Sequence, residues 1–287
     1  MITIKTPATS ANVGPGFDCF GLALNLYNTF EVELSDKNQL DNVEERFNND
    51  ENLFLQAYRK GCNEIGIEDP IHVIFHTEIP VSRGLGSSSS LITAGLYAAS
   101  LLHDNALSKE KIFQLASELE GHPDNVAPCI FGGFTASLTY NDTFLTRNIS
   151  LNESWKYTIF IPDFEVSTQR ARSILPSSYP REIVTKTTSH ASLLLEALRN
   201  GDLELLKIVS EDFIHEPYRK QLIHEFDDLK NIVSNKGTFL ISGSGSTCIL
   251  ISKVSLDENE IEQIHQLKHH WQIKELQIAK NGTEVIS

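Results

Sequence analysis

Residues 80–90 are the part of the chain whose residue types point most directly to chemistry. They read PVSRGLGSSSS and lead straight into a long apolar segment. Glycine lets the backbone approach a ligand closely, and the first turn of a helix offers N–H groups that have no partner within the helix. Such groups, together with the helix dipole, attract anions. The loop therefore predicts a phosphate-binding site, with serine hydroxyls that can cap the helix or ligate a magnesium ion.

Two common phosphate-binding motifs do not fit this loop. A Walker A loop needs a lysine after its last glycine, and only serines follow Gly86 directly. A dinucleotide fingerprint would need a third glycine where Ser89 stands. The alternatives are a flexible linker or an ordinary capped helix. The residues after position 90 argue against a linker, because they form an apolar helical surface that must be buried.

The composition describes a folded and acidic chain. Of its 287 residues 40% are hydrophobic, and the formal net charge is −14. A chain of this length forms one large or two medium domains. The negative charge argues against nucleic acid or an anionic membrane as a partner. The four cysteines lack metal-binding spacing, and we see neither a signal sequence nor a membrane span, so we expect a cytoplasmic protein.

Alternating strands and helices must position the loop, and they predict an α/β or α+β fold. We expect strands over 2–5, 29–34, 71–75, 157–162, 238–241, 247–252 and 274–279, and helices over 52–65, 88–103, 109–120, 189–199, 203–211, 222–234 and 256–269. Turn formers fill residues 8–18, and a second glycine-rich loop occupies residues 242–246. The polar stretch before residue 157 divides the chain into domains at 1–153 and 154–287.

Three segments, in this order and spacing, resemble the signature motifs of the GHMP kinases. They are PATSANVGPGFDCFGLAL at 7–24, the loop at 80–90 and ISGSGST at 241–247. The first segment, together with EGHPDNVAPCIFGGF at 120–134, STQRARSILP at 167–176 and HEPYR at 215–219, is similar to the homoserine kinase branch of that family. One departure is Ser246, where the family commonly has proline, so the third loop could be less rigid.

The resemblance implies a fold, a reaction and a setting for the protein. The fold is a two-domain α+β architecture, with an N-terminal domain like ribosomal protein S5 domain 2 and a C-terminal ferredoxin-like domain. The reaction is ATP-dependent phosphorylation of the side-chain hydroxyl of L-homoserine to O-phospho-L-homoserine, in threonine biosynthesis. Its cofactors are ATP and Mg²⁺, and the protein is expected to be a homodimer. The rivals are another small-molecule kinase of the family and a non-catalytic metabolite sensor that keeps the fold.

The resemblance also assigns residues to the magnesium ion and to the triphosphate of ATP. Ser88 and Glu120 would hold magnesium, which prefers oxygen ligands. Glu118 is a competing carboxylate on another face of the same helix, and a solvated helix end is the alternative for Glu120. The triphosphate would be bound by Pro80, Val81, Ser82, Arg83, Gly84, Leu85, Gly86, Ser87, Ser88, Ser89 and Ser90.

The amino-acid substrate is a zwitterion, so its site needs both charges. By resemblance, Asp18 and Asp124 would hold the ammonium, and Arg172 and Arg219 the carboxylate, which a guanidinium can bind bidentately. Asn125 would lie near the reacting hydroxyl. The full substrate-binding set is Asn12, Asp18, Asp124, Asn125, Thr168, Arg172 and Arg219, and the catalytic set is Ser88, Glu120, Asn125 and Arg172. Turn residues and surface cations are the alternatives for these positions.

His122 is a candidate general base, but a structural turn before Pro123 is the preferred interpretation. The resemblance implies transfer without a dedicated strong base, which a loose, metaphosphate-like transition state allows.

Overall fold

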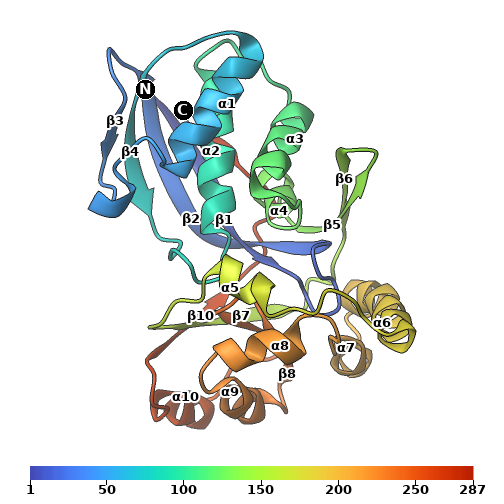
Figure 1. Cartoon of the computed structure of the whole chain (residues 1–287). Coiled ribbons are helices and arrows are strands. Elements are labelled where there is room, and N and C mark those ends of the chain that lie inside the picture. Colours follow the sequence, from blue (N-terminus) through green and yellow to red (C-terminus); the bar gives the residue numbers. More distant parts are fainter. Residues whose placement is uncertain (287) are drawn as a thin grey trace.

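A computed structural model describes residues 1–286 and divides them between two sheets with helices packed against them (Figure 1). This confirms the predicted α+β class. The first sheet has seven strands, in the order β11-β1-β2-β4-β3, with β5 added beside β2 and β6 beside β5. Its strands are β1 (Ile2–Ala11), β2 (Phe20–Leu34), β3 (Gln39–Asp41), β4 (Ile71–Thr77), β5 (Phe134–Tyr140), β6 (Thr143–Ile149) and β11 (Glu284–Ile286).

Four α-helices and one short 3-10 helix accompany the first sheet. They are η1 (Glu45–Phe47), α1 (Leu53–Ile65), α2 (Ser87–Leu101), α3 (Lys109–Glu120) and α4 (Val126–Phe131). Helices α1 and α2 cover the strands with a shared core, in which the rings of Phe30, Phe54 and Phe75 contact one another. Helix α2 directly follows the glycine loop, and the packing of its buried face fixes the direction of its axis.

The second sheet has four antiparallel strands in the order β10-β7-β9-β8. They are β7 (Lys156–Pro162), β8 (Gly237–Ile241), β9 (Cys248–Ser252) and β10 (Trp271–Leu276). The helices of this half are α5 (Thr168–Ser173), α6 (Arg181–Asn200), α7 (Leu203–Val209), α8 (Glu216–Arg219), η2 (Lys220–Leu222), α9 (Phe226–Val233) and α10 (Glu258–His265). Helix α5 lies where the two halves meet (Figure 1). No helix within residues 1–286 is both long and apolar enough to cross a membrane.

One hydrophobic core joins the two halves. It contains Ile79 and Leu85, on either side of the glycine loop, together with Ile159, Leu240 and Ile249 of the second sheet. All five side chains are buried. The loop is therefore fixed between the two sheets and does not hang from one of them.

Two local predictions need correction. Residues 8–11, expected as part of a loop, continue β1, because after a register shift at Pro7 they pair with residues 21–24 of β2 and are buried. The hairpin of β5 and β6 was not predicted. Its turn places Asn141 and Asp142 at φ of 47° and 61°, the left-handed conformation that tight hairpin turns require.

The division at residue 153 stays a prediction, and the end of the chain crosses it. Strand β7 begins at Lys156, but β11 returns to the first sheet and pairs with β1. The two ends of the chain consequently lie close together (Figure 1).

Candidate active site

The glycine loop approaches its neighbours more closely than any side chain would allow. Gly84 has φ of 73°, and a Cβ there would lie 2.2 Å from the carbonyl oxygen of Ser242. Gly86 has φ of 69°, and a Cβ there would lie 1.9 Å from the Thr9 hydroxyl. Because Gly86 caps α2, the free N–H groups of that helix begin at the loop. The sequence therefore needs glycine at both positions to bring a helix N-terminus to the site.

The second glycine-rich loop, residues 242–246, supports the first. The Ser242 hydroxyl donates to the Gly84 carbonyl at 2.7 Å, and the Thr247 N–H donates to the Arg83 carbonyl at 3.0 Å. Ser246 stands where the family commonly has proline. It is buried, and its hydroxyl donates to the Phe164 carbonyl at 2.7 Å. This hydrogen bond ties the loop to the segment after β7.

Ser88 and Glu120 meet as the sequence predicted. The Ser88 hydroxyl donates to Glu120 Oε2 at 2.8 Å, although the residues come from different helices. Burial raises the pKa of Glu120 above its ordinary value, against opposing effects of His122 and Ser88. No basic side chain within residues 1–286 forms an ion pair with this carboxylate. A hydroxyl and a carboxylate without a partner cation fit the oxygen ligands that magnesium prefers.

Asp18 and Arg172 pair with one another across the two halves of the molecule. The guanidinium of Arg172, on α5, donates from its two Nη atoms to the two carboxylate oxygens of Asp18, at 2.7 and 3.1 Å. Asp18 adopts φ of 53°, and its N–H donates to the side chain of Asn12 at 2.8 Å. The predicted ammonium and carboxylate ligands are thus adjacent, and each neutralises the other here.

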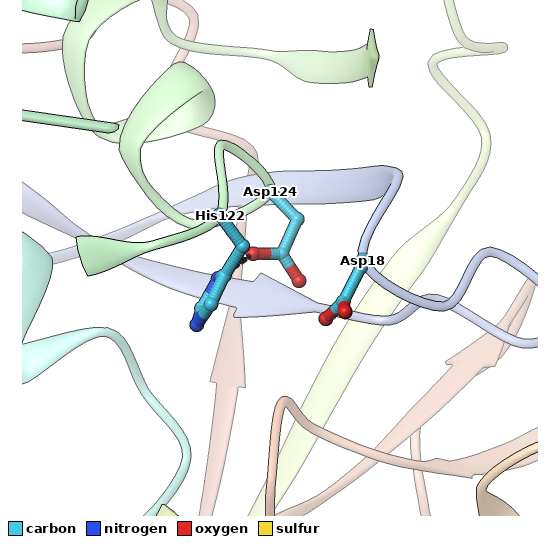
Figure 2. A group of neighbouring side chains, drawn as sticks. All are labelled: Asp18, His122 and Asp124. Carbon is cyan, nitrogen blue, oxygen red and sulfur yellow. Dashed lines mark hydrogen bonds and ion pairs between the residues drawn. The ribbon is translucent and has the colours of Figure 1, made fainter. Parts of the chain in front are cut away.

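Asp18, His122 and Asp124 form a compact group of possible ligand atoms, all within 4.8 Å of one another (Figure 2). Asp124 is fully buried, and one of its oxygens is hydrogen-bonded to His122. Its other oxygen, Oδ2, has no partner within residues 1–286. Although burial alone would lower the pKa of His122, the Asp124 carboxylate raises it. The group presents acceptors for a ligand that carries several N–H donors.

Arg219 is a buried cation. Its guanidinium donates to the backbone carbonyls of Ala171 and Gly243, at 3.2 and 3.0 Å, and has no carboxylate partner within residues 1–286. Burial, with the nearby charge of Arg172, lowers its pKa to about 10. Asn12 also donates to the Gly243 carbonyl, at 3.0 Å, so that carbonyl joins both sides of the site.

The remaining predicted polar residues lie at the same place. The Thr9 hydroxyl donates to Asn125 Oδ1 at 2.7 Å, which fixes the amide of Asn125 next to the glycine loop. The hydroxyls of Thr168 and Ser244 lie 3.3 Å apart.

A cavity of about 550 Å³ is lined by most of these groups. Of the predicted residues it is lined by Asn12, Val81, Ser82, Arg83, Gly84, Gly86, Ser87, Ser88, Glu120, Asn125, Thr168, Arg172 and Arg219. Six predicted residues do not line it: Asp18, Asp124, Pro80, Leu85, Ser89 and Ser90. The Ser90 hydroxyl instead contacts Thr6 and the amide of Asn28. The loop residues that do not line the cavity could bind a phosphate only through backbone groups.

The cavity also includes a wall that the sequence did not reveal. It extends along residues 42–53, where Val43, Phe47 and Leu53 add apolar surface. That segment is rich in Asn and Glu and resembles an ordinary solvated loop, so its side chains carry no signal of a site. The wall gives the cavity an apolar end beyond the glycine loop.

Comparison with known proteins defines the class. The family model for the GHMP kinases N terminal domain matches residues 52–133, and that for the GHMP kinases C terminal domain matches residues 194–268. Each match contains residues that line the cavity, among them Ser88 and Glu120 in the first and Arg219 in the second.

Relatives narrow the class further. The chain is 38% identical to a homoserine kinase of Clostridium botulinum strain Okra, over 99% of this chain and 98% of that one. It is 36% identical to a homoserine kinase of Clostridium acetobutylicum, over the whole of both chains. A crystal structure of homoserine kinase from Cytophaga hutchinsonii superimposes with a TM-score of 0.87 at 28% identity, over 99% of this chain and 97% of that one. The chain belongs to the homoserine kinases of the GHMP kinase family.

Proposed function

We propose that this chain transfers the γ-phosphate of ATP to the side-chain hydroxyl of L-homoserine, giving O-phospho-L-homoserine and ADP for threonine biosynthesis. The observation that carries the proposal is the content of the cavity. One end is lined by a helix N-terminus with Ser88 and Glu120, and the other by Arg172 and Arg219, of which Arg172 is paired with Asp18. These are the groups that a triphosphate and an amino-acid zwitterion require.

The nucleotide end would bind ATP through the glycine loop. The N–H groups at the start of α2 bind phosphate oxygens, and the apolar wall at Val43 and Phe47 accommodates the base. Ser88 and Glu120 would hold Mg²⁺, which when bound neutralises charge on the phosphate oxygens. Glu120 must lose its proton to act as a ligand.

The substrate end would bind homoserine by an exchange of partners. An ammonium group has three N–H donors, which matches Asp18 together with the unpaired Oδ2 of Asp124. The substrate carboxylate would then take the guanidinium of Arg172 that Asp18 releases, and the free donors of Arg219. The ammonium of the substrate takes the place of Arg172 beside Asp18, and its carboxylate takes the place of Asp18 beside Arg172. Both residues therefore keep a partner of opposite charge.

The reacting hydroxyl would lie between the two ends, beside Asn125. His122 donates from Nδ1 to the Asp124 carboxylate, and its side chain lines the cavity. Positioning of the hydroxyl against the γ-phosphate supplies the catalysis, since the loose transition state needs alignment more than a strong base.

An ADP-release assay tests the proposal. The purified protein is given Mg-ATP with homoserine, mevalonate, galactose, serine or threonine, and we expect the highest kcat/KM for homoserine. Turnover of mevalonate or galactose without homoserine would contradict the substrate while keeping the family. Binding of ATP without turnover of any of these alcohols would make the chain a sensor.

We also propose that the protein is a cytoplasmic homodimer. Its four cysteines are unpaired, which suits a reducing compartment. Light scattering on the purified chain measures the oligomeric state, and a mass near 32.1 kDa, that of one chain, would contradict the dimer.

A further inference from the structure

The ring of Phe17 is a meeting point of side chains from both halves of the molecule. The guanidinium carbons of Arg219 and Arg172 lie over the ring, 5.1 and 5.7 Å from its centroid. The ring of His215 stacks on it at 5.6 Å, with an angle of 28° between the planes. Both guanidiniums fall within the distance of about 6 Å at which the face of an aromatic ring attracts a cation.

Arg219 makes this contact unusual. A buried charge is costly unless it is compensated, yet within residues 1–286 Arg219 has two carbonyl acceptors and no carboxylate. An acidic side chain would compensate the charge more strongly, but it would also occupy the N–H donors that face the cavity. An aromatic ring attracts the guanidinium through its face and leaves those donors free.

We propose that Phe17 is a positioning residue for the substrate carboxylate. Its ring holds Arg172 and Arg219 side by side, offsets part of their repulsion, and does not compete with the substrate for their N–H groups. This inference rests on the function proposed above. It assigns the affinity for the carboxylate to three residues, of which only the two arginines carry charge.

The surroundings fix the ring in place. His215 Nε2 donates to the carbonyl of Gly14, at 3.2 Å, in the segment that carries Phe17. The buried carboxylate of Asp212 accepts the N–H groups of His215 and Glu216, both at 2.7 Å, at the start of the helix that carries Arg219. The ring and the guanidinium are therefore held by the same short network.

Steady-state kinetics of Phe17→Leu and Phe17→Tyr test the role. Leucine keeps an apolar side chain and removes the aromatic face, so we expect KM for homoserine to rise about tenfold while kcat and KM for ATP change little. Tyrosine should restore KM. Tyr27→Leu is the matched control, because Tyr27 is also half-buried under a cation, but that cation is Lys5, at 3.9 Å, and neither Arg172 nor Arg219.

The outcomes separate this inference from the proposed function. Absence of homoserine phosphorylation by the native chain would overturn both. An active native chain with an unchanged KM for homoserine in Phe17→Leu would overturn the role of Phe17 alone. If Phe17→Leu does not fold, trifluorophenylalanine incorporated at position 17 keeps the shape and weakens the cation attraction. An increased KM with this ring supports the inference, and an unchanged KM overturns it.

Discussion

Glu120 occupies a position that its own helix disfavours. It is the last residue of α3, where the helix dipole is negative, and it is held by Ser88 and by no cation within residues 1–286. The magnesium ion that we propose Glu120 holds would offset this unfavourable position. The family resemblance assigned both residues of the pair in advance, whereas Glu120 by itself resembles a solvated helix end.

Glu120→Gln should lower kcat by about two orders of magnitude, because it keeps the shape and removes the charge at the phosphate end. Glu118→Gln is the control. Glu118 lies two residues away on α3 and pairs with Lys60 at 2.9 Å on the surface, so its variant should keep native kcat. Equal losses in the two variants would show that the effect comes from α3 and not from a magnesium ligand.

The raised pKa of Glu120 predicts how magnesium and pH act together on stability. Burial raises this pKa, so the folded protein holds the proton more tightly than the unfolded chain does. The stability from Glu120 is therefore fully present below the unfolded value of about 4.3 and is lost as pH rises through the raised pKa. Bound magnesium needs the ionised carboxylate and offsets that loss at higher pH.

We expect Mg²⁺ with ADP to raise the Tm of the native protein more at about pH 8 than at about pH 5, because a smaller fraction of the Glu120 carboxyl is protonated at the higher pH. Differential scanning calorimetry of the native chain and of Glu120→Gln measures the effect. The variant should lose the part of the pH dependence that belongs to Glu120, and an identical dependence in both proteins would exclude Glu120 as a ligand.

At the scale of elements, two glycine-rich loops from different sheets form one support. The loop at 80–86 presents a helix N-terminus, and the loop at 242–246 holds its backbone through Ser242 and Thr247. The sequence indicated both loops by composition. The sequence could not predict that the two loops contact each other. They are about 160 residues apart, and no residue in either loop indicates that the other is its neighbour.

Gly84→Ala should raise KM for ATP at least about tenfold, because its Cβ would lie 2.2 Å from the backbone of Ser242 and push the loops apart. Gly66→Ala separates this clash from simple backbone strain. Gly66 has a similar φ of 75° but no atom within 4 Å of the added Cβ. The Gly66→Ala substitution should lower the free energy of unfolding by about 1 kcal/mol and leave KM for ATP unchanged. An unchanged KM in Gly84→Ala would contradict the role of the loop contact.

Other elements were less accessible to prediction. The strand end at residues 8–11 follows Pro7 and contains threonine and serine, which occur often in turns, but its pairing with β2 overrides that local preference. The wall at residues 42–53 is polar and short of regular structure, so its place at the cavity depends wholly on tertiary folding.

At the scale of the whole molecule, the substrate end exists only because the two halves meet. Asp18 and Asp124 come from the first half, and Arg172 and Arg219 from the second. The sequence predicted these four residues through motifs, but their pairing in the free protein could not be read from spacing. Under the proposed function, a substrate that carries both charges replaces both partners of that pair.

Substrate analogues test this property. 4-Hydroxybutanoate lacks the ammonium and 3-aminopropan-1-ol lacks the carboxylate, so each would open the Asp18–Arg172 pair and leave one charge alone. We expect kcat/KM for each to fall at least about a hundredfold below that for homoserine. In Arg172→Leu the preference for homoserine over 3-aminopropan-1-ol should shrink. An unchanged preference would mean that Arg172 does not bind the carboxylate.

The most direct measurement is the identification of the phosphorylated product by ³¹P NMR, in a reaction of the purified protein with Mg-ATP and L-homoserine. A cavity that aligns the γ-phosphate with the side-chain hydroxyl predicts one phosphate monoester on the side-chain oxygen for each ADP formed. Formation of ADP with inorganic phosphate in place of the ester, or an ester formed on mevalonate and not on homoserine, would contradict it.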